Sequence, residues 1–155
     1  MVLELEQSRA VPVSTERAWG VLTTPLERIF TRRFAGIPPV RGVRDQDGEW
    51  GRVGQTRTVL LTDGGTMREE LASVEAGREF GYRIDGVTGP MKALVSSVEG
   101  RWAFTPAGTG VRITWAWTVH PAHAFTAPAL PVFGWMWRGY ARQALEQLET
   151  LLLEP

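Results

Sequence analysis

The feature that most constrains the fold of this chain is the long apolar stripe at its C-terminal end. From Pro128 or Pro131 to Leu153, large apolar residues recur every three or four positions, which predicts one long helix with a wide buried face. A helix of this length spans on the order of 35 Å. It is the only predicted element long enough to cover the apolar face of a sheet, so it must pack on whatever sheet the rest of the chain forms.

The segments before this helix alternate apolar and polar residues, which is typical of strands with one buried and one wet face. Two pairs of these segments are separated by hairpin signals, Asp63-Gly64-Gly65 and Pro106-Ala107-Gly108, where glycine supplies the positive φ that tight turns need. We therefore predict an α+β helix-grip fold, with a curved antiparallel sheet of about six or seven strands over an internal cavity. The expected strands are residues 2–11, 53–62, 66–75, 79–84, 93–105 and 109–119.

Two short helices are expected directly after the first strand. Ser14 is placed to cap a helix that runs to Leu22. The segment Thr24–Glu27 has the pattern of a capping box with proline at the first helical position, which predicts a second helix to about Phe34. Residues 35–52, rich in glycine, proline and aspartate, are expected to form a loop.

Composition excludes several classes of function. The chain has no cysteine, which excludes disulfides and thiolate chemistry, and its 17 basic residues are balanced by 17 acidic ones, which disfavours nucleic-acid binding. No apolar stretch reaches the roughly 18 residues of a membrane span, and the N-terminal segment lacks the pattern of a signal peptide. We expect one cytoplasmic domain over residues 1–155 without a cofactor; its oligomeric state stays open.

The two histidines, His120 and His123, lie three positions apart between the last predicted strand and the long helix. Proline separates them, and no nearby aspartate, glutamate or cysteine completes a set of ligands, so we expect loop histidines and no metal site. The sequence also singles out no Ser-His-Asp triad and no phosphate-binding glycine loop.

The order of elements resembles the START/Bet v 1-like superfamily, also described as polyketide cyclase/dehydrase and lipid-transport (SRPBCC-type) proteins. The resemblance covers nearly the whole chain and is carried by the opening Val11–Trp19, the hairpin from Gly54 to Glu69, and the closing Trp137-Arg138-Gly139-Tyr140. The last two segments are similar to an actinobacterial-type subgroup. The resemblance implies the fold; its members include carriers, cyclases, hormone receptors and co-chaperone modules, and no catalytic motif of the family maps onto this chain.

Arg57 and Glu69 are the charged residues that we expect to matter most. With Asp63-Gly64-Gly65 as the loop, Arg57 is predicted opposite Leu71, which makes Arg57 and Glu69 diagonal neighbours on the apolar, inward face. A bidentate pair there would orient a polar group of a ligand, and a desolvated Glu69 would be able to act as a general acid or base. The alternatives are a purely structural ion pair, or a surface pair if the register slips by one residue.

Seven tryptophans, with six phenylalanines and two tyrosines, are a high aromatic content for 155 residues. Large rings either fill a core or line a pocket, and Tyr82 or Tyr140 would supply a hydrogen-bonding hydroxyl to a pocket. Trp50 is predicted either to cover the cavity mouth or to pack in the core. The residues expected to line a ligand site are Arg57, Glu69, Leu71, Phe80, Tyr82, Trp102, Trp115, Trp117, Phe133, Met136, Trp137 and Tyr140.

Three functions follow from this interpretation. The first is binding of an apolar small molecule, lipid-, aromatic- or polyketide-like, between sheet and helix. The second is a cyclase or aromatase that folds a polyketide-like substrate in the same cavity. The third is a protein-interaction module that uses the groove beside the long helix.

Overall fold

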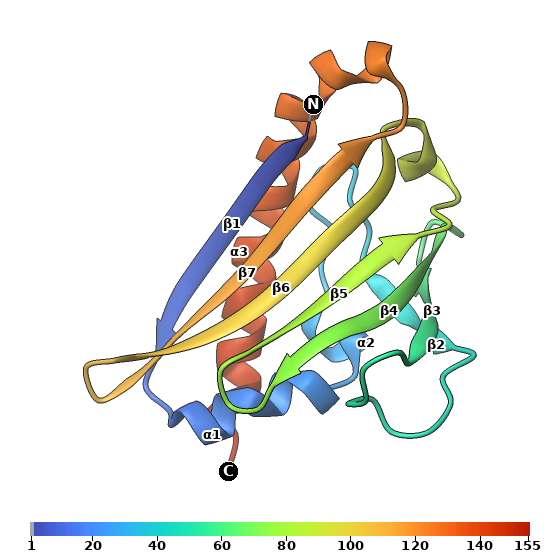
Figure 1. Ribbon diagram of the computed structural model, residues 1–155. Helices are drawn as coiled ribbons and strands as arrows, with labels where there is room; N and C mark the ends of the chain where they lie inside the picture. The colour runs from blue at the N-terminus through green and yellow to red at the C-terminus, as the bar shows by residue number, and fades with distance from the viewer. Residues whose placement is uncertain (1) are drawn as a thin grey trace.

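The computed structural model describes residues 2–155 and contains one seven-stranded antiparallel sheet in the order β1-β7-β6-β5-β4-β3-β2 (Figure 1). The first strand pairs with the last, and every other neighbour in the sheet is also a neighbour in sequence. This agrees with the predicted curved antiparallel sheet. The strands are β1 (Leu3–Val11), β2 (Val40–Arg44), β3 (Thr56–Leu61), β4 (Thr66–Glu75), β5 (Glu79–Asp85), β6 (Val95–Ala107) and β7 (Gly110–Pro121).

The helices confirm the predicted order of short elements after β1 and one long element at the end. Ser14 caps α1 as expected, because its hydroxyl accepts a hydrogen bond of 3.0 Å from the backbone N–H of Arg17. None of the helices within residues 2–155 has the length and apolar character needed to cross a membrane. They are α1 (Thr15–Ala18), η1 (Trp19–Thr23, a 3-10 helix), α2 (Leu26–Ile29), η2 (Pro90–Ala93), η3 (Ala124–Ala129) and α3 (Leu130–Leu152).

Two local predictions between β1 and β3 were wrong. Helix α2 ends at Ile29 instead of Phe34, and the predicted capping box does not form, because the Thr24 hydroxyl donates to the backbone oxygen of Gly20 at 2.7 Å. Strand β2 lies inside the predicted loop 35–52. It has only Val40 and Val43 as apolar residues and pairs with β3 alone, so it is a short edge strand without a clear alternating signal.

The hairpin between β3 and β4 keeps the predicted faces but has a different register. Arg57 pairs directly with Glu69 and Val59 with Met67, whereas the sequence analysis placed Arg57 opposite Leu71. The turn begins one residue earlier than expected, because the Gly64 N–H bonds to the oxygen of Leu61 and Gly64 takes a positive φ of 90°. The shift is two residues, so the inward face is unchanged.

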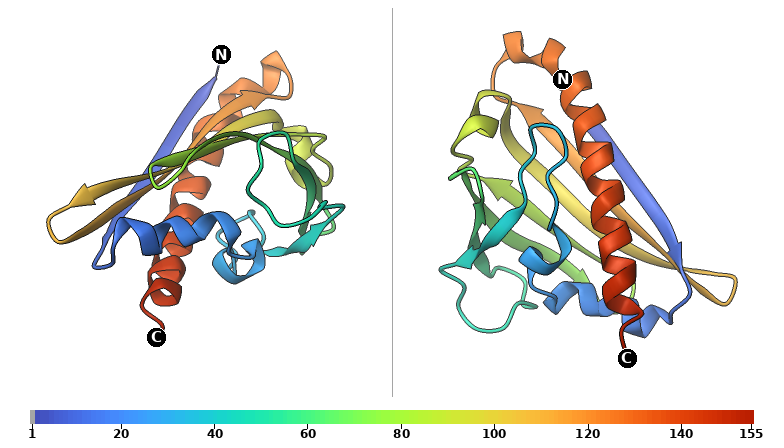
Figure 2. Two further views of the ribbon diagram at one scale, coloured as in Figure 1. Left: turned by 60° about the horizontal axis from the view of Figure 1, so that its bottom comes forward. Right: turned by 180° about the vertical axis from the view of Figure 1, so that it is seen from behind.

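Helix α3 covers only part of the concave face of the sheet. In the rear view of Figure 2 it lies along β1 and β7, while the segment between α2 and β2 lies beside it over the other strands. That segment is tied to α3, since the Tyr140 hydroxyl donates to the backbone oxygen of Pro38 at 2.9 Å and the rings of Phe30 and Tyr140 stack at 5.6 Å. The concave face is therefore covered by one long helix on one side and by short elements on the other.

Candidate functional site

A cavity lies between the concave face of the sheet and the short elements that cover β3 to β6. Its volume is about 70 Å³, which is room for a few waters and less than half of an engineered cavity of about 150 Å³ that binds benzene. The wall is mostly apolar, and its lining residues are Val21, Leu22, Leu26, Ile29, Phe30, Ile37, Pro38, Val40, Arg57, Val59, Leu61, Met67, Glu69, Phe80, Tyr82, Ile84, Met91, Trp102, Trp115, Trp117 and Tyr140.

Eight of the twelve residues predicted for a ligand site line this cavity. They come from β3, β4, β5, β6, β7 and α3, so the sheet gathers side chains that are far apart in the sequence. These eight are Arg57, Glu69, Phe80, Tyr82, Trp102, Trp115, Trp117 and Tyr140.

The other four predicted residues do not line the cavity. Leu71, Phe133 and Trp137 are fully buried in the packed core, and Met136 is half-buried with its terminal atoms near Gly36. For Phe133, Met136 and Trp137 the reason is the position of α3. The first half of this helix packs against the strands at the β1 edge, so Trp137 lies against the ring of Trp115, 4.7 Å between ring centroids, without reaching the cavity.

Arg57 and Glu69 form a buried ion pair at the cavity wall. The Arg57 Nε donates to Glu69 Oε1 at 2.8 Å, and the two residues are 6% and 5% exposed. The pair is joined by this one hydrogen bond and not by the expected bidentate contact. The guanidinium also stacks on the ring of Trp50, 3.9 Å from Cζ to the ring centroid, so Arg57 is held on two sides.

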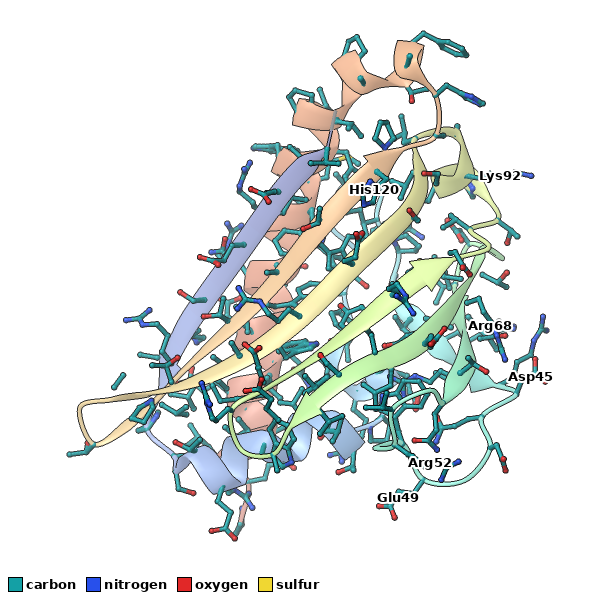
Figure 3. The ribbon with its side chains drawn as sticks, in the orientation of Figure 1. Asp45, Glu49, Arg52, Arg68, Lys92 and His120 are labelled. Carbon is teal, nitrogen blue, oxygen red and sulfur yellow. The ribbon has the colours of Figure 1, made fainter. Side chains whose placement is uncertain are left out.

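Trp50 is buried, which decides between the two roles predicted for it. It belongs to the loop that joins β2 to β3, and the charged residues of this loop, such as Asp45, Glu49 and Arg52, project to the outside (Figure 3). The loop therefore turns one large ring inward, against Arg57, and leaves these three charged residues in solvent.

Gln55 organises this loop, and the sequence analysis missed it. Its side-chain oxygen accepts from the backbone N–H groups of Gly51 and Arg52 at 2.8 and 2.6 Å. Its amide nitrogen donates to the backbone oxygens of Asp47 and Glu49, both at 2.9 Å. A buried glutamine that satisfies four backbone groups fixes an otherwise irregular segment. Nothing in the sequence distinguishes it from a surface glutamine.

Tyr82 is the polar residue at the centre of the aromatic wall. Its hydroxyl oxygen accepts a hydrogen bond from Trp115 Nε1 at 2.7 Å and another from Trp117 Nε1 at 2.9 Å. Burial raises the pKa of the Tyr82 hydroxyl above its ordinary value, and the negative charge of Glu69 raises it further. Tyr82 therefore stays neutral and keeps its proton across the physiological pH range.

Gly100 allows this arrangement and was also missed. It pairs with Tyr82 across β5 and β6, and a Cβ added at Gly100 would collide with the phenol ring. Because Gly100 has no side chain, the ring of Tyr82 lies flat across β6 and reaches the two indoles on β7. A lone glycine inside a strand pattern is the signal that would have indicated such a close approach.

One group of lining residues that the sequence analysis missed comes from the short elements after β1. Leu22, Leu26, Ile29 and Phe30 recur at three- and four-residue spacing on one side of η1 and α2. Their periodicity was visible, but it did not show which wall of the sheet they would cover.

The two histidines lie outside the cavity wall. His120 is in β7, and its Nε2 lies 2.6 Å from Glu99 Oε2 at the surface, whereas His123 is exposed and stacks on the ring of Phe125. Among residues 2–155, no group of three or more His, Cys, Asp or Glu side chains is arranged to hold a metal ion.

A curved antiparallel sheet that grips one C-terminal helix and encloses an apolar cavity defines the helix-grip class of proteins. Within this class, the chain belongs to the family described as polyketide cyclase / dehydrase and lipid transport, whose model matches residues 2–153. No curated protein sequence matches the chain.

Solved structures with the same fold include plant and bacterial proteins. The chain superposes with a TM-score of 0.73 on ginseng major latex-like protein 151 from Panax ginseng, at 12% identity over 99% of both chains. Ara h 8.0201 gives 0.68 at 15% identity, again over 99% of both chains. Protein Ms6760 from Mycobacterium smegmatis gives 0.65 at 20% identity, over 99% of this chain and 92% of that one. At these identities the comparisons show a Bet v 1-like fold.

Proposed function

We propose that this protein binds a small apolar molecule in the cavity between its sheet and its helices. The observation that carries the proposal is the cavity itself, an apolar space of about 70 Å³ whose wall holds an ion pair and a phenolic hydroxyl. Well-packed interiors leave few voids larger than one water molecule, so a space of this size has a cost in stability that a bound molecule would remove.

The volume bounds the size of the ligand. A space of about 70 Å³ is less than half of a cavity of about 150 Å³ that binds benzene, so one small ring is the upper limit and its entry requires the wall to move outward; a folded polyketide chain or a lipid is far larger. This supports binding rather than cyclisation as the function of the cavity in this conformation. A ligand of that size has little surface to bury at about 25 cal/mol per Å², so the expected dissociation constants are micromolar to millimolar.

The proposal is tested by binding of a one-ring hydrocarbon to the intact protein. Toluene should bind with one site by isothermal titration calorimetry, and the indole N–H signals of Trp115 and Trp117 in NMR spectra should shift, because both rings line the cavity. Native mass spectrometry of protein purified without refolding would reveal a ligand that copurifies with it.

Two substitutions of neighbouring leucines provide a matched pair. Leu61 lines the cavity and Leu60 lies on the opposite face of β3, half-buried. Leu61→Phe should fill the space and abolish toluene binding, whereas Leu60→Phe should leave it unchanged. Toluene binding that survives Leu61→Phe, or a complete lack of binding to the unmodified protein, would contradict the proposal.

A further inference from the structure

Two polar groups at the cavity wall, the Tyr82 hydroxyl and the Glu69 carboxylate, can each form one more hydrogen bond, and this indicates which polar group a ligand carries. This inference rests on the proposed function and concerns the polar group that the ligand carries. We infer that the cavity selects a neutral one-ring molecule with a hydroxyl group, a phenol or small alcohol, over hydrocarbons, ethers and carboxylic acids.

Tyr82 can only donate to a ligand. A phenolic oxygen accepts through two lone pairs and donates one hydrogen, and both acceptor positions of Tyr82 are taken by the N–H groups of Trp115 and Trp117. Within residues 2–155 its own hydrogen has no hydrogen-bond acceptor. A buried donor without a partner is costly, so the wall at Tyr82 favours a ligand that presents an oxygen acceptor.

Glu69 can only accept. A carboxylate has no hydrogen to donate, and only Oε1 is engaged, by Arg57 Nε at 2.8 Å. Oε2 accepts no hydrogen bond from the part of the chain that the structure describes. This oxygen favours a ligand that presents a hydrogen-bond donor.

The free donor of Tyr82 and the free acceptor of Glu69 lie close together on the same wall. Glu69 pairs with Ile84 across β4 and β5, and Leu71 pairs with Tyr82, so Glu69 and Tyr82 are diagonal neighbours on the inward face of adjacent strands. The charge of Glu69 contributes to the raised pKa of Tyr82, which agrees with this proximity. A group that accepts from Tyr82 and donates to Glu69 at one point is a hydroxyl group.

The charge of the site excludes acids. The positive charge of Arg57 is already matched by Glu69 and stacked on Trp50, so the wall has no net positive charge to offer a carboxylate. A carboxylate bound near Tyr82 would also face the like charge of Glu69 in a desolvated space. The ligand is therefore expected to be neutral.

The test is a series of four one-ring molecules of nearly equal size, titrated into the unmodified protein by calorimetry. The series contains p-cresol (donor and acceptor), 4-methylanisole (acceptor only), toluene (neither) and 4-methylbenzoate (charged). We expect p-cresol to bind about tenfold more tightly than 4-methylanisole or toluene, the effect of one or two net hydrogen bonds, and 4-methylbenzoate not to bind. The indole N–H signals of Trp115 and Trp117 should shift most with p-cresol.

The two tyrosines of the chain give a matched pair of variants. Tyr82→Phe should reduce the preference of p-cresol over toluene, because the free donor is lost and only Glu69 Oε2 remains to bind the hydroxyl of p-cresol. Tyr140→Phe should keep the preference whatever its overall affinity, because the Tyr140 hydroxyl already donates to Pro38. If Tyr82→Phe does not fold, the ligand series on the unmodified protein decides alone.

Each outcome of the ligand series separates the inference from the proposed function. Equal affinities for p-cresol and toluene would overturn the hydroxyl inference and leave apolar binding intact. Equal affinities for p-cresol and 4-methylanisole, or tight binding of 4-methylbenzoate, would also overturn it. Binding of none of the four would overturn both the inference and the proposed function.

Discussion

The two sides of the curved sheet use the same concave surface in different ways. On the side of β1 and β7, residues such as Val111 and Ile113 have no exposed surface, and this side of the sheet packs on α3. On the side of β3 to β5, short elements cover the sheet and leave a cavity. The buried polar or charged residues within 2–155 all belong to this second side; they are Gln55, Arg57 and Glu69.

The difference follows from what covers each side. A long helix presents a continuous row of apolar side chains, which fills space efficiently against a sheet. The four-residue helix α2 and the chain that follows it cannot do so, and beside the remaining space the charges of Arg57 and Glu69 are tolerated because they pair with each other. The packed side stabilises the fold, and the open side holds the cavity that we propose as the binding site.

The largest effect is expected when the ion pair on the open side is broken. Arg57→Met would leave Glu69 as an unpaired buried carboxylate and should lower the free energy of unfolding by about 4 kcal/mol, measured by chemical denaturation. The double variant Arg57→Met/Glu69→Leu should recover most of this loss, because no charge is then buried. If Arg57→Met were as stable as the parent, the Glu69 carboxylate would have to be hydrated, and the open side would not exclude water.

A truncation on the packed side should cost about 3 kcal/mol and spare binding. Leu148 is 1% exposed on α3 and lies outside the cavity wall, so Leu148→Ala creates a new void in the packed core. Toluene affinity should stay unchanged by calorimetry. Leu61→Ala at the cavity wall should instead enlarge the existing space and admit naphthalene. Naphthalene binding to Leu148→Ala would contradict the distinction between a packed side and a cavity side.

Alkaline pH should destabilise the protein through the two tyrosines, which both line the cavity. Burial raises the pKa of each hydroxyl above its ordinary value of 10.0, so the unfolded chain loses protons before the folded one. The stabilisation is complete below pH 10 and is lost as the pH rises, with a slope that approaches about 2.7 kcal/mol per pH unit.

Absorbance of phenolate measures this directly, because the chain has two tyrosines. No phenolate should form until the protein unfolds, and both tyrosines should then ionise together. A tyrosine that titrates near pH 10 in the folded protein would contradict its burial against the cavity.

The smallest of these effects concerns the glycine beneath Tyr82. A methyl group at Gly100 would overlap the phenol ring, so Gly100→Ala should displace the ring and cost about 2 kcal/mol in chemical denaturation. Gly20→Ala is the control, because a Cβ there meets no atom within 4 Å. Equal stability of the two variants would show that Tyr82 does not depend on Gly100.

The sequence predicted the elements that carry their own local signal. Alternation and turn glycines identified β1 and β3 to β7, and the three- and four-residue repeat identified α3. Strand β2 was missed because its strand character comes from pairing with β3. Helix α2 was predicted too long because the backbone leaves the helical conformation at Phe30, where ψ is 70°, and no local pattern marks this residue.

For the site, the sequence predicted which side chains point inward, but not which of them reach the cavity. The inward face of the hairpin set the direction of Arg57 and Glu69 even though its register was shifted by two residues. Whether an inward aromatic residue meets a cavity or a packed neighbour depends on the angle at which α3 crosses the sheet, which no local pattern encodes. Trp137 was therefore assigned to the cavity wrongly.

The closely spaced indoles of the wall also have an optical consequence. The rings of Trp102 and Trp115 lie 5.5 Å apart and those of Trp115 and Trp117 lie 5.6 Å apart, centroid to centroid. At such separations the electronic transitions of neighbouring chromophores couple and excitation passes between them. The near-ultraviolet circular dichroism of this protein should therefore contain an exciton contribution from its cavity wall, and any occupant that moves one ring will change it without a label.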